Sequence, residues 1–121
     1  MKALVVEKSD AMRSVLRRIL SKRYFEVAEA DNGQQAFEVL SLIGPADLVL
    51  VSWFPHGSDD LEFITRLRRK SVHNSIVIVL ATVEPRLRDL QRALVAGAND
   101  YLMRPFTSLQ IDEMLVRFGL A

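Results

Sequence analysis

The chain has 121 residues, of which 50% are hydrophobic and 26% are charged, and its formal net charge at pH 7 is +1. This length and composition predict one globular domain over residues 1–121 that folds around a single core. Cysteine is absent, which excludes a disulfide framework, a thiolate metal site and a thiol nucleophile. The apolar stretches are too short for a signal peptide or a membrane span, so we expect a cytoplasmic protein without membrane association.

Basic residues gather in two segments, residues 13–23 and 66–70. Each segment also has apolar residues at helical spacing, so a solvated outer helix face explains the charge better than a nucleic-acid-binding patch does. We therefore expect no direct binding of nucleic acid.

Short apolar runs alternate with helical periodicity along the chain, which predicts an α/β fold of βα units around a parallel sheet. In the first half, the strands are predicted at residues 3–6, 25–30 and 47–51. A helix is predicted after each of the first two strands. Ser9 is the expected N-cap of the first helix, and Gly44 with Pro45 ends the second.

The second half of the chain continues this pattern. Phe63, Ile64 and Leu67 form the buried stripe of a predicted third helix. Residues 76–80 are a nearly continuous apolar run, which is typical of a strand covered on both faces.

Two further helices and a strand complete the pattern. A fourth helix is predicted to begin near Pro85. Its expected inward side chains are Leu87, Leu90 and Leu94. A short strand is predicted at 101–103, and Ser108 is the expected N-cap of the last helix. The expected inward side chains of this helix are Leu109, Met114, Leu115 and Phe118.

Parallel sheets with helices on both faces carry their functional crevice outside the carboxyl ends of the strands. Polar residues follow four of the five predicted strands at that edge. The residues expected to converge there are Glu7, Lys8, Ser52, Thr82 and Arg104.

Read with its neighbours, this set resembles the receiver domain of bacterial response regulators, the CheY-like fold, over essentially the whole chain. The most specific stretch is residues 96–106, which is similar to the strand-five motif of that family with Arg in place of the usual Lys, and residues 47–53 and 59–63 support it. The resemblance implies a five-stranded parallel sheet in the flavodoxin-like order 2-1-3-4-5, with helices on both faces. It also implies a role in two-component signal transduction.

In that family, two acidic residues after strand one and an aspartate after strand three hold Mg²⁺, and this aspartate takes a phosphoryl group from a histidine kinase. The corresponding residues here are Glu7, Lys8, Ser52 and, for the lysine of the family, Arg104. The family's three carboxylates and lysine sum to −2, whereas these four residues sum to +1. We therefore expect no metal, no cofactor and no catalytic residue, and we expect Lys8 to pair with Glu7 in place of the metal charge.

The other matches to the family concern its conformational switch. Thr82 matches the hydroxyl residue that responds to phosphorylation, and Tyr101 matches the rotating aromatic residue. Whether these residues still act as a switch is left open, since a threonine at a strand end and an aromatic on an edge strand both have ordinary structural roles. Arg104-Pro105 corresponds to a peptide bond that is typically cis, so we expect the cis form.

The loop over residues 53–60 departs from the family pattern, and we expect its backbone to be reshaped. His56 in this loop and His73 before the fourth strand have no second ligand at metal spacing, so we interpret both as ordinary loop residues.

These observations favour a non-enzymatic receiver domain that acts by protein–protein interaction, without aspartyl phosphorylation or Mg²⁺. In the family, the face of helix four, strand five and helix five binds partners or forms dimers. The residues expected on that face are Arg86, Arg88, Arg92, Tyr101 and Met103. An output domain could follow the chain.

Two alternatives remain open. One is a regulator that is phosphorylated on Ser52 or on a neighbouring carboxylate such as Asp59, although no base that would activate the Ser52 hydroxyl is evident. The other is an anion or small-ligand binding module, in which Lys8 and Arg104 face the ligand beside Ser52 and Thr82.

Overall fold

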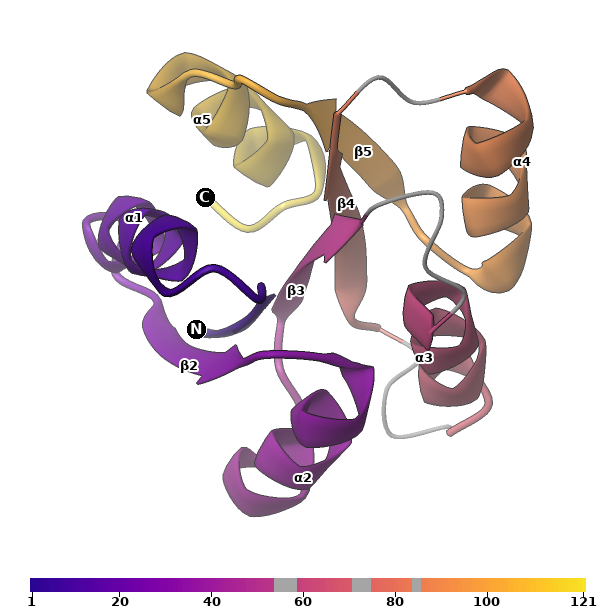
Figure 1. The fold of residues 1–121 in the computed structure, drawn as a ribbon. Helices are drawn as coiled ribbons and strands as arrows, with labels where there is room; N and C mark the ends of the chain where they lie inside the picture. Colours follow the sequence, from indigo (N-terminus) through magenta and orange to yellow (C-terminus); the bar gives the residue numbers. More distant parts are fainter. Residues whose placement is uncertain (54–58, 71–74, 84–85) are drawn as a thin grey trace.

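The chain folds as alternating strands and helices around one parallel sheet (Figure 1). The computed structural model describes residues 1–53, 59–70, 75–83 and 86–121. The five strands lie in the order β2-β1-β3-β4-β5, and every neighbouring pair is parallel. The predicted fold class and strand order are therefore confirmed.

The strands and helices cover the predicted segments with small changes at their ends. The strands are β1 (Lys2–Val6), β2 (Glu26–Ala30), β3 (Leu48–Trp53), β4 (Val77–Thr82) and β5 (Asp100–Met103). The helices are α1 (Asp10–Ser21), α2 (Gly33–Ile43), α3 (Asp59–Arg68), α4 (Leu87–Ala96) and α5 (Ser108–Arg117). No helix in the described part of the chain combines the length and the apolar character needed to cross a bilayer.

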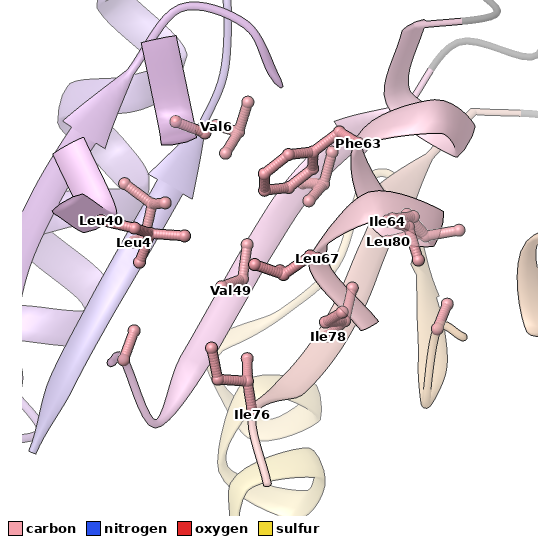
Figure 2. Close-up of a cluster of buried hydrophobic side chains, with 14 of the residues drawn as sticks. Leu4, Val6, Leu40, Val49, Phe63, Ile64, Leu67, Ile76, Ile78 and Leu80 are labelled. Atoms are coloured by element: carbon pink, nitrogen blue, oxygen red, sulfur yellow. The ribbon is translucent and has the colours of Figure 1, made fainter. Parts of the chain in front are cut away.

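Side chains alternate between the two faces of each strand, and each face is buried beneath helices. One cluster joins the sheet to α2, α3 and α4. Figure 2 shows Val49 and Ile78 of the strands beside Leu67 of α3, and Leu4 beside Leu40 of α2. The other cluster joins the opposite face to α1 and α5. The central strands β1, β3 and β4 are almost entirely apolar because helices cover the sheet on both sides, whereas the edge strand β2 carries Glu26 and Glu29.

The buried side of α4 differs from the predicted one. Ala93 and Asp89 are buried and Leu90 is partly buried, but Leu87 is 71% exposed and Leu94 is also exposed. The prediction that Leu87 and Leu94 face inward is wrong. Small residues mark the side of the helix that approaches the sheet, and the two leucines remain on its surface.

The start of α5 also differs from the prediction. Thr107, not Ser108, is the N-cap: its hydroxyl accepts a hydrogen bond from the Gln110 N–H, and the Gln110 side chain accepts one from the Thr107 N–H. This reciprocal capping box satisfies two otherwise free N–H groups. The helix therefore starts at Ser108, one residue earlier than a Ser108 cap would place it. Leu109 is exposed, so the prediction that it faces inward is wrong, whereas Ile111, Met114 and Leu115 are buried.

We predict that Thr107→Ala lowers the free energy of unfolding by about 1 kcal/mol, because an N-cap side chain is lost. Ser108→Ala, its matched control, should change stability by less than about 0.5 kcal/mol. Urea unfolding followed by circular dichroism measures both variants. Equal losses for the two variants would contradict the assigned cap.

Candidate functional site

The carboxyl ends of the central strands lie level with one another. Val51 of β3 pairs with Val6 of β1 on one side and with Leu80 of β4 on the other. Glu7 directly follows Val6 and Ser52 directly follows Val51, so these two polar residues come side by side at the same edge of the sheet. Both are buried.

Arg104 comes to this edge from the end of β5. Its N–H donates a hydrogen bond to the Thr82 carbonyl at 2.8 Å, which continues the pairing between β4 and β5 by one residue. The peptide bond from Arg104 to Pro105 is cis, as predicted. The Arg104 side chain turns back over the strand ends, where Nη2 donates to Glu7 Oε1 at 3.1 Å and also to Ser52 Oγ.

Strand periodicity explains why these three side chains meet. The residue two positions before each of them belongs to the core cluster beneath α1 and α5. Because side chains on a strand alternate with a period of two, Glu7, Ser52 and Arg104 all emerge on this face of the sheet. We call these three residues the Arg104 cluster.

Thr82 follows the opposite alternation. Ile78 and Leu80 of the same strand belong to the cluster beneath α2, α3 and α4, and Thr82 continues that series. Its Oγ1 is buried and makes no hydrogen bond with any described residue. The Thr82 backbone carbonyl therefore accepts a hydrogen bond from Arg104, but the Thr82 side chain makes none with the Arg104 cluster.

The predicted pair between Lys8 and Glu7 is wrong. The Glu7 carboxylate makes its ion pair with Arg104, whereas Lys8 is exposed and, among the described residues, forms neither an ion pair nor a hydrogen bond. Lys8 is one residue beyond Glu7, so it does not share the side of the chain on which Ser52 and Arg104 lie.

Arg13 is a site residue that the sequence analysis missed. Its Nη1 donates to the Glu7 carbonyl at 2.7 Å and to Asp31 at 2.6 Å, and its Nη2 donates to Asp10 at 2.5 Å. Burial acts against the charged guanidinium, but the hydrogen bond with Asp10 and the neighbouring carboxylates together raise the pKa of Arg13 above its ordinary value. Arg13 thus fixes the backbone of Glu7. The sequence signal for this role is the position of Arg13 in the first turn of the helix that follows β1.

The charges of the Arg104 cluster are balanced within the protein. Glu7 is 4% exposed and the side chain of Arg104 is 15% exposed, so both charges are largely removed from water. A largely buried carboxylate needs a partner, and the guanidinium supplies one together with a hydrogen bond. The cluster carries one negative and one positive charge, so it has no net charge.

These residues do not fit a magnesium ion. Mg²⁺ requires several oxygen ligands in near-octahedral geometry, whereas Glu7 supplies the single carboxylate of the Arg104 cluster and its Oε1 is hydrogen-bonded to a cation. Within the described ranges, no group of three or more His, Cys, Asp or Glu residues is placed to hold a metal. The groups at the strand ends form an ion pair and do not provide a set of metal ligands.

Ser52 lacks the surroundings of an activated nucleophile. Its Oγ accepts a hydrogen bond from Arg104, and no carboxylate or imidazole among the described residues is hydrogen-bonded to the hydroxyl. A serine nucleophile needs such a base. The predictions on His56 and the reshaped loop, on His73 and on Pro85 fall outside the described residues, as does the side chain of Asp59.

The predicted interface residues are all exposed, but they do not all belong to one surface feature. Tyr101 and Met103 are exposed on the edge strand β5. Arg88 and Arg92 instead line a groove between α3 and α4. Arg86 is exposed at the N-cap of α4.

The fold and the polar cluster at its strand ends define a flavodoxin-like α/β domain with its site at the carboxyl edge of the sheet. The family model of the response regulator receiver domain matches residues 3–116. The chain therefore belongs to the response regulator receiver domains of two-component signalling.

Individual relatives agree with this assignment. The chemotaxis protein CheY1 of Helicobacter pylori is 32% identical over 116 residues, which are 95% of this chain and 94% of that protein. A response regulator from Thermotoga maritima has 26% identity and a TM-score of 0.85, and the match covers 99% of this chain and 98% of that one. The fold also matches the chemotaxis protein CheY4 of Vibrio cholerae, with 23% identity, a TM-score of 0.87 and 97% coverage of both chains.

The ion pair of the Arg104 cluster should contribute measurably to stability. We predict that Arg104→Met lowers the free energy of unfolding by about 2–3 kcal/mol, because it leaves the Glu7 carboxylate buried without a partner. The double variant Glu7→Gln, Arg104→Met should recover at least half of that loss. Arg117→Met, which breaks the more exposed pair with Asp100, is the control and should cost less than about 1 kcal/mol. Additive losses in the double variant would contradict a coupled pair.

The unpaired Thr82 hydroxyl gives a second prediction. Thr82→Val removes a buried polar atom that makes no hydrogen bond in the described structure, so it should be neutral or stabilise the protein by up to about 1 kcal/mol. Ser52→Ala removes an acceptor of Arg104 and should destabilise the protein by about 1 kcal/mol. Thermal and urea unfolding measure both, and a clear destabilisation by Thr82→Val would show that the hydroxyl has a partner.

Proposed function

We propose that this receiver domain acts by binding a protein partner without aspartyl phosphorylation and without Mg²⁺. The observation that carries the proposal is the Arg104 guanidinium, which donates to both Glu7 and Ser52 at the strand ends. The proposal also includes the absence of enzymatic activity, because Ser52 has no base within the described site.

The Arg104 cluster supports this proposal through its charge. A phosphoryl group and a divalent cation would have to enter a place where a carboxylate is already neutralised by a cation of the chain itself. Binding of Mg²⁺ would require Glu7 to exchange a hydrogen-bonded guanidinium for the metal, with no further carboxylate in the cluster to complete the coordination. The arrangement thus favours one fixed conformation of the strand ends.

The surface proposed for the partner lies on α4 and β5. Leu87 and Leu94 are seven residues apart, which is close to two helical turns, so they occupy one side of α4. Both are exposed, as are Tyr101 and Met103 on β5. Exposed leucine, tyrosine and methionine on adjacent elements of one domain are typical of a protein-binding surface.

The anion-binding alternative has less support from the geometry. It needs Arg104 and Lys8 as free cations facing one ligand, but Arg104 is paired with Glu7 and Lys8 is exposed outside the cluster. Phosphorylation of Ser52 would need a base, and none is hydrogen-bonded to its hydroxyl within the described residues. Phosphorylation of another carboxylate, such as Asp59, is tested by the mass measurement described next.

Incubation with acetyl phosphate or phosphoramidate and Mg²⁺, followed by intact mass measurement, tests the central part of the proposal. We expect no covalent addition to the wild-type chain, because the cluster offers neither an available carboxylate nor an activated hydroxyl. The triple variant Lys8→Asp, Ser52→Asp, Arg104→Lys restores the residue types of the family and is the positive control. Stoichiometric gain of one phosphoryl group by the wild-type chain would refute the proposal.

Substitutions on the surface test the second part. Proteins retained by the immobilised domain should be lost with Tyr101→Ala, because this removes an exposed anchor from β5, and they should be retained with Ser52→Ala. Quantitative mass spectrometry of the bound fraction measures the difference. If binding depends on neither residue, the proposed surface is wrong.

A further inference from the structure

A groove runs between α3 and α4, which lie next to each other on one side of the sheet (Figure 1). Its volume is about 540 Å³, within the range of roughly 300–1,000 Å³ that is usual for binding pockets. The residues that line it are Leu61, Thr65, Arg88, Gln91, Arg92, Val95 and Ala96. It is therefore large enough to receive several side chains of a partner.

The lining combines an apolar floor with basic flanks. Leu61 and Ala96 are partly buried in the groove, whereas Val95 is 88% exposed. Arg88, Arg92 and Val95 follow the spacing i, i+4, i+7, which places them along one side of α4. This side differs from the one that carries Leu87 and Leu94, so the groove is separate from the surface proposed above.

The arginines of the groove have N–H groups that can donate hydrogen bonds to a partner. Arg88 is exposed and forms no ion pair with a described residue, and Arg92 reaches Asp89 only at 4.0 Å. The described lining contains no carboxylate. Guanidinium groups beside an apolar floor are suited to a partner whose carboxylates flank apolar side chains. Each carboxylate can accept two parallel hydrogen bonds from one guanidinium.

We propose that the α3–α4 groove binds an acidic amphipathic helix of a protein partner, with its apolar residues against Leu61 and Val95 and its carboxylates against Arg88 and Arg92. The helices α3 and α4 form the two walls of the groove. A third helix can lie between two such helices and pack its apolar side chains against both. A nucleic acid fits less well, because the floor is apolar and Arg88 and Arg92 are the only cations among the described residues that line the groove. The inference does not depend on the phosphorylation state of the domain.

A displayed library of random peptides about 15 residues long tests this inference, since helices of this length are the shortest that are marginally stable alone. Selection on the wild-type domain should enrich peptides that carry Asp or Glu beside apolar residues spaced i, i+3, i+4, i+7. The enriched peptides are then synthesised with a fluorophore, and their affinities are measured by anisotropy. Failure to enrich any peptide, or enrichment of basic peptides, would overturn the proposal.

Variants then locate the binding site. Arg88→Glu, Arg92→Glu should weaken binding of the selected peptide by roughly tenfold or more, and Val95→Ser should also weaken it. The control Arg18→Glu, Lys22→Glu makes the same charge change at exposed positions in and beside α1 and should leave affinity within about twofold. Equal effects of the two charge reversals would show non-specific attraction and overturn the site. Tyr101→Ala should not affect this binding, which separates the groove from the β5 surface.

Discussion

The guanidinium of Arg104 determines the character of the strand ends. It lies where β1, β3 and β5 finish, and it donates to a carboxylate and a hydroxyl that come from two other strands. Because Glu7 is almost completely buried, its charge needs a partner in any folded state that keeps this edge closed. The partner comes from the chain itself. The site thus has the architecture of a receiver domain and the electrostatics of an internal ion pair.

This arrangement separates two properties of the domain, its pocket and its outer surfaces. The Arg104 cluster is largely buried at the sheet edge, while β5 and the two exposed sides of α4 carry exposed apolar and basic groups. A surface of this kind can bind a partner without any chemical change in the pocket. Coupling of the two regions through Thr82 and Tyr101 would require the Thr82 hydroxyl, which makes no hydrogen bond with a described residue, to acquire a partner in another conformation.

The sequence predicted most of the fold because its strands are apolar runs and its helices have regular apolar spacing. It failed where local chemistry offered two equivalent choices. Thr107 and Ser108 are adjacent hydroxyl residues, and only the Gln110 side chain identifies Thr107 as the cap. Leu87 and Leu94 are apolar and periodic, yet they face outward because Ala93 and Asp89 occupy the buried side of α4. Hydrophobicity alone does not distinguish a core stripe from an exposed binding stripe.

The site residues were predicted as a group, because parallel strands bring their carboxyl ends to one edge, but their pairing was not. Alternation along the strands favours Arg104 as the partner of Glu7, whereas proximity in the sequence favours Lys8. A crystal structure of the protein grown with millimolar Mg²⁺ tests the central claim most directly. We predict that Arg104 Nη2 remains hydrogen-bonded to Glu7 and Ser52 with no metal beside them. A magnesium ion coordinated by Glu7, with Arg104 displaced, would contradict this account.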